Sequence, residues 1–140
     1  MAAIKAKTLV IIKPGAVQNK HSGEIINLIE KAKFKILHMK KMCLSKEDAQ
    51  KFYDIHAGKP FFNELVGSMS LKPVIVMVLE KENGIQDFIG MVGATNPAES
   101  ATGTLRNMFG TSHTENALHR SDAPQTAEAE IKFFFPECEV

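Results

Sequence analysis

The stretch Pro73-Val-Ile-Val-Met-Val-Leu79 decides the fold, because it is apolar at both alternating positions of an extended chain. Successive side chains of a strand point to opposite faces, so we expect a central strand that is covered on both sides. Earlier in the chain, Thr8-Leu-Val-Ile-Ile-Lys13 is a second β-branched apolar run, and Pro14-Gly15 ends it. We predict that this run is also a buried strand.

Two weaker patterns complete the predicted sheet. The segment from Phe34 to Leu44 alternates imperfectly around His38 to Lys41, which indicates a bulge or an edge position. A short last strand is predicted at Ala117-Leu118-His119, after a segment from Gly93 to Glu115 that has little periodicity. A loop of that length in a small domain is usually functional.

Apolar residues at helical spacing predict helices between the strands. We expect Ser22 to cap the first helix, Asn83 to open a capping box, and Ser121 or Asp122 to cap the last helix. The order is strand, helix, strand, helical pair, strand, helix, long loop, strand, helix. It predicts one α+β domain over residues 1–140 with a ferredoxin-like split β-α-β arrangement, in which a four-stranded antiparallel sheet carries helices on one face.

The composition is that of an ordinary globular chain, with 44% hydrophobic and 24% charged residues. A formal net charge of +1 gives no support for a nucleic-acid partner. The two cysteines, Cys43 and Cys138, are far apart and lack metal-like spacing, which indicates a reduced chain. No signal-peptide pattern opens the sequence, and no apolar run approaches the ~20 residues of a membrane span. We therefore expect a cytoplasmic protein that binds no membrane.

The segment Asn116-Ala-Leu-His119-Arg-Ser-Asp122 carries the strongest candidate for chemistry. It places His119 where an apolar strand meets a polar turn, and Glu130 follows about two turns into the last predicted helix. If that helix packs on the sheet, the carboxylate can reach one imidazole nitrogen and leave the other free to act as a nucleophile. The alternative is a partly exposed histidine at a strand end without a catalytic role.

Other kinds of site have less support. No G-x-x-x-x-G-K-[ST] loop follows a strand, and no G-x-G-x-x-G turn opens a helix. His113, Glu115 and His119 can be imagined as metal ligands, but they lack the i, i+4 spacing of a helical site. We therefore expect no metal site built from protein ligands.

Six short stretches occur in an order and spacing that match a known family: Thr8-Leu-Val-Ile-Ile-Lys-Pro14, Phe52-Tyr-Asp-Ile-His56, Gly58-Lys-Pro-Phe-Phe62, Gly93-Ala-Thr-Asn-Pro97, Gly103-Thr-Leu-Arg106 and Asn116-Ala-Leu-His119-x-Ser-Asp122. Over nearly its full length the chain resembles the nucleoside diphosphate kinases. The resemblance implies a transferase of nucleotide metabolism that works by a ping-pong mechanism. The γ-phosphoryl group of a nucleoside triphosphate passes to a histidine and then to a nucleoside diphosphate.

The resemblance implies catalytic roles for five residues. His119 would be the nucleophile, and Glu130 would hold its far ring nitrogen. Lys13 would balance charge on the transferring phosphates, Tyr53 would lie near the nucleophile, and Ser121 would support the turn and Glu130.

The resemblance also implies a nucleotide site. Arg106 would join Lys13 at the phosphates, and Thr95 would donate to a neighbouring phosphate oxygen. Asn116 would contact the sugar, and Phe61 would stack on the base with little regard for its identity. Mg²⁺ would be held mainly through the nucleotide phosphates. The implied partners are ATP and other nucleoside di- and triphosphates, together with further copies of the chain in a dimer, tetramer or hexamer.

Each of these residues has an ordinary alternative when it is taken alone. Lys13 can be a strand-end lysine, Arg106 a solvated loop arginine, and Phe61 a core residue. Thr95 and Asn116 are common in loops. Because these residues occur together in the family order, the catalytic and binding roles are favoured over the ordinary alternatives.

Three positions depart from the family pattern. Ile89 stands where the family usually has a phosphate-binding arginine, Arg120 where it has glycine, and Gly15 where it has aspartate. Arg120 would be strained if its backbone needs a positive φ, or its guanidinium could replace the missing charge. The departures leave an alternative function open, a catalytically weakened nucleotide-binding or regulatory protein with the same fold.

Overall fold

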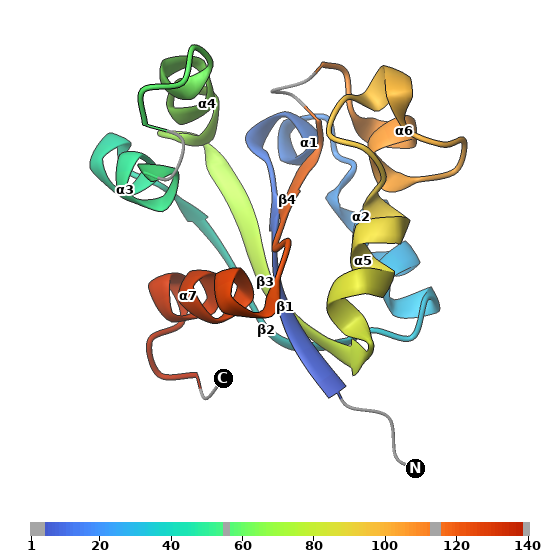
Figure 1. Cartoon of the computed structure of the whole chain (residues 1–140). Coiled ribbons are helices and arrows are strands. Elements are labelled where there is room, and N and C mark those ends of the chain that lie inside the picture. The colour runs from blue at the N-terminus through green and yellow to red at the C-terminus, as the bar shows by residue number, and fades with distance from the viewer. Residues whose placement is uncertain (1–4, 55–56, 113–115, 139–140) are drawn as a thin grey trace.

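The computed structural model describes residues 5–54, 57–112 and 116–138, and within these ranges a four-stranded antiparallel sheet forms the centre of the molecule (Figure 1). Its strands are β1 (Lys5–Ile12), β2 (Lys35–Cys43), β3 (Pro73–Glu82) and β4 (Leu118–Arg120). The strand order is β2-β3-β1-β4, so β4 pairs with β1 and is an edge strand among the described residues. The predicted ferredoxin-like α+β fold is confirmed.

The two middle strands are buried on both faces. Leu9 and Ile11 of β1 belong to one apolar cluster, and Val10 and Ile12 belong to a second cluster on the opposite face. All four side chains are 0% exposed. Alternate residues of one strand therefore enter two separate cores.

Helices cover both faces of this sheet, so the prediction that they lie on one face is wrong (Figure 1). We call one cover the α7 layer; it consists of α3 (Lys46–Phe52), α4 (Phe62–Met69) and α7 (Pro124–Phe134). The α5 layer, on the other face, consists of α1 (Pro14–Gln18), α2 (Ser22–Lys31), α5 (Gly84–Val92) and α6 (Leu105–Phe109). A single layer would leave half of the apolar surface of β1 and β3 in water, which is why two layers form.

Two segments with weak sequence patterns, β2 and the segment after Gly93, have identifiable local structures. The pairing of β2 with β3 shifts register between Ile36 and His38, and β2 is also an edge strand, so both explanations of its imperfect alternation hold. The predicted loop after Gly93 contains a 3₁₀ turn, η2 (Pro97–Glu99), as well as α6. Elements of three to five residues are too short to produce a helical period in the sequence.

The predicted helix caps are corrected in three places. Ser22 lies inside α2, and no side chain caps that helix. Asn83 holds the N-cap position of α5 with a φ of 56°, but its side chain accepts no bond from the helix. Before α7 the N-cap residue is Ala123, so neither Ser121 nor Asp122 holds that position, and no side chain caps the helix. Ser121 donates its hydroxyl to Glu130 instead. None of the helices in the described ranges has the length and apolar character that crossing a bilayer requires.

Candidate active site

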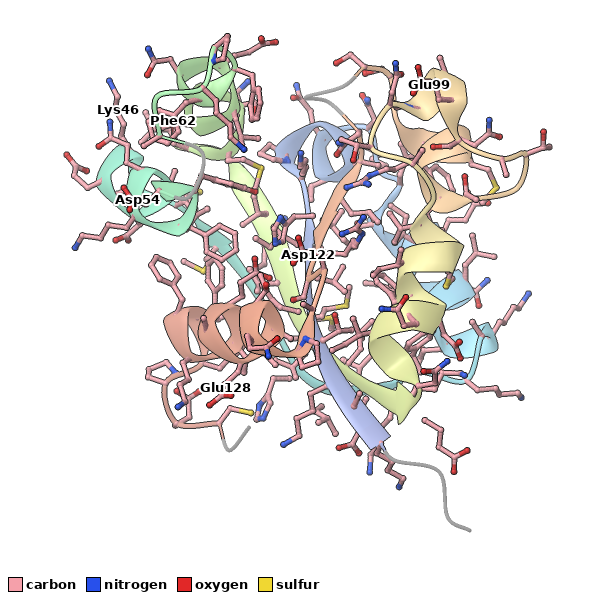
Figure 2. All side chains as sticks on the ribbon, in the orientation of Figure 1. Lys46, Asp54, Phe62, Glu99, Asp122 and Glu128 are labelled. Atoms are coloured by element: carbon pink, nitrogen blue, oxygen red, sulfur yellow. The ribbon has the colours of Figure 1, made fainter. Side chains whose placement is uncertain are left out.

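A cleft of about 410 Å³ lies beside β4, between the two helical layers. Figure 2 shows one of its lining residues, Asp122, near the middle of the molecule between these layers. Seven of the nine residues that the sequence analysis singled out line this cleft: Lys13, Tyr53, Phe61, Thr95, Arg106, Asn116 and His119. Leu65, Arg120 and Asp122 complete its lining.

Segments far apart in the sequence supply these side chains. Lys13 follows β1 directly, and its backbone N–H donates to the carbonyl of Ala117 at 2.9 Å, which ties β1 to the start of β4. Ala117 has a φ of 78°, a left-handed conformation that is uncommon outside glycine. Strain of this kind is stored where the surrounding structure fixes the backbone, and here it turns the chain from the cleft wall into β4.

The two predicted residues that do not line the cleft lie behind His119 in a hydrogen-bond chain. The backbone N–H of Leu9 donates to Ser121 Oγ at 3.2 Å, and Ser121 Oγ donates to Glu130 Oε1 at 2.7 Å. Glu130 Oε2 lies 2.9 Å from Nε2 of His119. An ionised carboxylate only accepts hydrogen bonds, so Nε2 carries the proton. Nδ1 is then the ring nitrogen with an available lone pair.

Two aromatic rings enclose the same imidazole. The ring of Phe52 lies edge-on to His119 at 5.0 Å between centroids, and the ring of Tyr53 lies at 5.7 Å. Burial raises the pKa of the Tyr53 hydroxyl far above its usual value, and the charge of Glu130 raises it further. Tyr53 therefore stays protonated and can donate a hydrogen bond. Phe52 was not predicted as a site residue, although it begins one of the six matching stretches.

Arg106 is buried and anchored, so it is not a solvated loop arginine. It is 5% exposed, and its guanidinium donates to the carbonyls of Gly93 at 3.3 Å and Leu118 at 2.9 Å. Burial lowers its pKa to about 10, and the nearby charge of Arg120 contributes to the shift. The group is still a cation at neutral pH. Lys13 is buried to the same extent, so the cleft contains two largely buried basic side chains.

The remaining predicted residues form the outer wall. Asn116 is 2% exposed, and its amide donates to the backbone carbonyl of Thr95 at 3.2 Å. Thr95 itself is exposed at the mouth of the cleft. Phe61 is half-buried at the start of α4, where it packs against the core of the α7 layer. Phe61 is thus both a packing residue and part of the cleft wall.

The three departures from the family pattern occupy different positions. Arg120 lies in β4 opposite Val10 and is not among the residues with a positive φ. The backbone strain that a positive φ would cause at Arg120 is therefore absent. It is half-buried and lines the cleft. Ile89 is half-buried on α5 and is not among the described residues that line the cleft. Gly15 lies within α1.

The metal-ligand alternative involves residues that the structure describes only in part. His113 and Glu115 lie outside the described residues. His119, the third member, contacts Glu130. Within the described ranges, no group of three or more histidine, cysteine, aspartate or glutamate side chains is placed to hold a metal ion.

A family model described as nucleoside diphosphate kinase matches residues 6–140. The chain belongs to the nucleoside diphosphate kinase family. The nucleoside diphosphate kinase of Flavobacterium psychrophilum is 49% identical over 129 residues, which cover 92% of the chain and 93% of that relative. The nucleoside diphosphate kinase of Citrifermentans bemidjiense is 48% identical over 134 residues, which cover 96% and 98%.

Solved structures agree with this assignment. The Aquifex aeolicus nucleoside diphosphate kinase superposes with a TM-score of 0.92 at 37% identity, over 94% of the chain and 96% of that structure. The nucleoside diphosphate kinase of Encephalitozoon cuniculi gives a TM-score of 0.90 at 29% identity, over 93% and 88%. The chain is therefore an enzyme with nucleoside diphosphate kinase activity, and the similarities do not favour the regulatory alternative.

Proposed function

We propose that this enzyme transfers the γ-phosphoryl group of a nucleoside triphosphate to a nucleoside diphosphate in two steps, through a phosphohistidine at Nδ1 of His119. The observation that carries the proposal is the 2.9 Å contact between Glu130 Oε2 and His119 Nε2. It holds one ring nitrogen and leaves the other with its lone pair, in a residue that lines the cleft.

In the first step the Nδ1 lone pair of His119 attacks the γ-phosphorus, and the bond from that phosphorus to the β–γ bridging oxygen breaks. The nucleoside diphosphate leaves, and the imidazole becomes a phosphorylated cation. Glu130 stabilises that cation because its carboxylate accepts from Nε2. In the second step a terminal oxygen of another nucleoside diphosphate attacks the same phosphorus and releases the histidine. One cleft then serves donor and acceptor in turn.

The other lining residues suit positioning and charge stabilisation, on which phosphoryl transfer mainly depends. Lys13 and Arg106 are buried cations that would neutralise the phosphate oxygens. Tyr53 keeps its proton and would hold the transferring group near His119 as a donor. Thr95 is exposed at the mouth and would donate to a neighbouring phosphate oxygen.

The sugar and base would lie at the outer wall. Asn116 would contact the sugar, and its bond to the Thr95 carbonyl fixes the orientation of its amide. Phe61 would stack on the base through the face of its half-buried ring. A stacking contact reads no hydrogen-bond pattern, so bases of different identity would be accepted.

The donor set of the cleft suits Mg²⁺ that arrives with the nucleotide. Its lining includes the cations Lys13, Arg106 and Arg120, against the exposed carboxylate of Asp122. Glu130 is already engaged by His119 and Ser121. The nucleotide phosphates would therefore supply most Mg²⁺ ligands, and the bound ion would withdraw charge from the phosphate oxygens.

We also propose a cytoplasmic homo-oligomer. Within the described ranges β2 is an edge strand, and Met39 on it is 54% exposed. An exposed edge with an apolar side chain is covered in many proteins by another chain. Sedimentation equilibrium would distinguish a dimer, a tetramer and a hexamer.

The test of the catalytic proposal is the intact-protein mass after incubation with ATP and Mg²⁺, followed by addition of GDP. We expect one acid-labile phosphoryl group to appear and then to leave as GTP forms. The His119→Ala variant should bind ADP yet gain no mass. If the wild-type enzyme binds nucleotide and gains no phosphoryl group, the histidine mechanism is wrong.

A further inference from the structure

Arg120 and His119 are neighbours in β4 that point to opposite faces of the sheet. His119 lies opposite Ile11, which belongs to the apolar cluster under the α7 layer. Arg120 lies opposite Val10, which belongs to the apolar cluster under the α5 layer. Residues directly opposite in an antiparallel pair share a face. Because β4 is an edge strand, its open side lets both side chains line one cleft. Arg120 therefore reaches the cleft from the layer that carries Arg106.

The two arginines form a like-charged pair. The charge of Arg120 helps to lower the pKa of Arg106, so their guanidinium groups are close enough to repel each other. In the described part of the chain, neither arginine takes part in a salt bridge. Bringing two cations together at a partly buried site without a counter-ion is unfavourable. A bound anion would remove that penalty.

The donor groups of this pair are also incompletely used. The Nε atoms of Arg106 and Arg120 are both shielded from solvent, and neither has a hydrogen-bond partner among the described residues. A buried donor without an acceptor costs free energy. Phosphate oxygens are strong acceptors and match the fork of a guanidinium group. The position beside the proposed nucleophile is therefore prepared for a polyphosphate.

We propose that Arg120 is a third phosphate-binding cation of this cleft, together with Lys13 and Arg106, and that it binds the phosphate chain of both donor and acceptor nucleotides. The proposal rests on the proposed function, since it uses the same cleft. Arg120 contacts the phosphates in the ground state as well as during transfer, so its loss raises KM and Kd more than it lowers kcat.

The test measures the Kd of adenosine, ADP and ATP by calorimetry for the wild type and Arg120→Gln. We expect ADP and ATP to bind roughly tenfold to a hundredfold more weakly to the variant. Adenosine, which has no phosphate, should bind equally to both. Arg120→Lys should recover part of the loss, because it restores charge without the planar fork. The matched control is Lys46→Gln, which removes one charge on the outer side of α3, away from the cleft (Figure 2).

Thermal unfolding provides a second readout. Without nucleotide, the melting temperature of Arg120→Gln should equal or exceed that of the wild type, because one repelling charge is gone. The rise in melting temperature on adding ADP should be smaller in the variant. A purely structural arginine would give the opposite result, with a lower melting temperature and an equal loss of adenosine and ADP affinity. That result, or unchanged ADP affinity, overturns the proposal.

Failure of this inference can be told apart from failure of the catalytic proposal. If Arg120→Gln binds ADP normally while wild-type His119 becomes phosphorylated, only the role of Arg120 is wrong. If the variant loses ADP affinity while wild-type His119 gains no phosphoryl group, Arg120 binds phosphate and the histidine mechanism is wrong.

Discussion

On the α7 side of β4 the polar groups form a continuous hydrogen-bond chain from the Leu9 N–H through Ser121 and Glu130 to His119. On the α5 side, Arg106 and Arg120 approach each other without a carboxylate partner among the described residues. The first side is complete in the folded chain and fixes one imidazole geometry. By the proposals above, the second side would be completed by the phosphates of a bound nucleotide. Folding energy would then orient His119, and binding energy would be reserved for the phosphates.

The largest expected effect comes from breaking the α7 side alone with Glu130→Gln. A glutamine amide can donate to Nε2, which would place the proton on Nδ1 and remove the nucleophilic lone pair. We expect kcat to fall on the order of 10²- to 10⁴-fold, while the Kd of ADP stays near the wild-type value. Steady-state kinetics and calorimetry would measure the two quantities.

The control for that variant is Glu128→Gln on the same helix (Figure 2). Its carboxylate is exposed and forms an ion pair with Lys132. We expect this variant to keep both kcat and Kd. A Glu130→Gln enzyme with wild-type kcat would show that the hydrogen-bond chain does not prepare the histidine.

A smaller effect is expected from Arg106→Gln on the α5 side. The carbonyls of Gly93 and Leu118 would lose their guanidinium donors, so the free energy of unfolding should fall by about 1–3 kcal/mol. ADP affinity should also fall, by roughly tenfold to a hundredfold. Urea unfolding and calorimetry would measure these changes.

A loss of both stability and ADP affinity in Arg106→Gln would distinguish Arg106 from Arg120. Arg106 is expected to act both in stability and in phosphate binding, whereas Arg120 is expected to act in binding alone. If Arg106→Gln unfolds at the same urea concentration as the wild type, its anchoring bonds contribute nothing to stability.

The smallest effect concerns the ionisation of Tyr53, the single tyrosine in the chain. Its folded pKa lies above the unfolded value of 10.0, so its contribution to stability is complete below pH 10 and is lost as the pH rises further. Tyrosinate absorbance should therefore appear only together with unfolding. Because the charge of Glu130 contributes to the shift, Glu130→Gln should lower the pKa of Tyr53 in the folded protein. Tyrosinate absorbance in the folded wild type near pH 10 would contradict this prediction.

One contact of the candidate site could be predicted from the residues themselves, whereas the other site residues were implied by the family resemblance. His119 and Glu130 were expected to meet because a helix that returns over a sheet brings its polar face to the strand end, and the two side chains are 2.9 Å apart. Phe52 was missed because an aromatic residue in an amphipathic helix has the same pattern whether it packs in a core or against a catalytic ring. The burial and anchoring of Arg106 were also not predicted, because a short helix shows no periodic pattern in the sequence.

The amino-acid order was sufficient to predict β1 and β3 as central strands of one ferredoxin-like sheet, because their apolar residues occupy both alternating faces. Local order in the chain was enough for that inference. The three-dimensional structure was needed to find that helices cover both faces and that Ser121 supports Glu130 instead of capping α7. It also decided that Arg120 enters the cleft without backbone strain. These outcomes depend on which distant groups meet, and a hydrogen bond or a charge repulsion across the sheet leaves no periodic trace in the sequence.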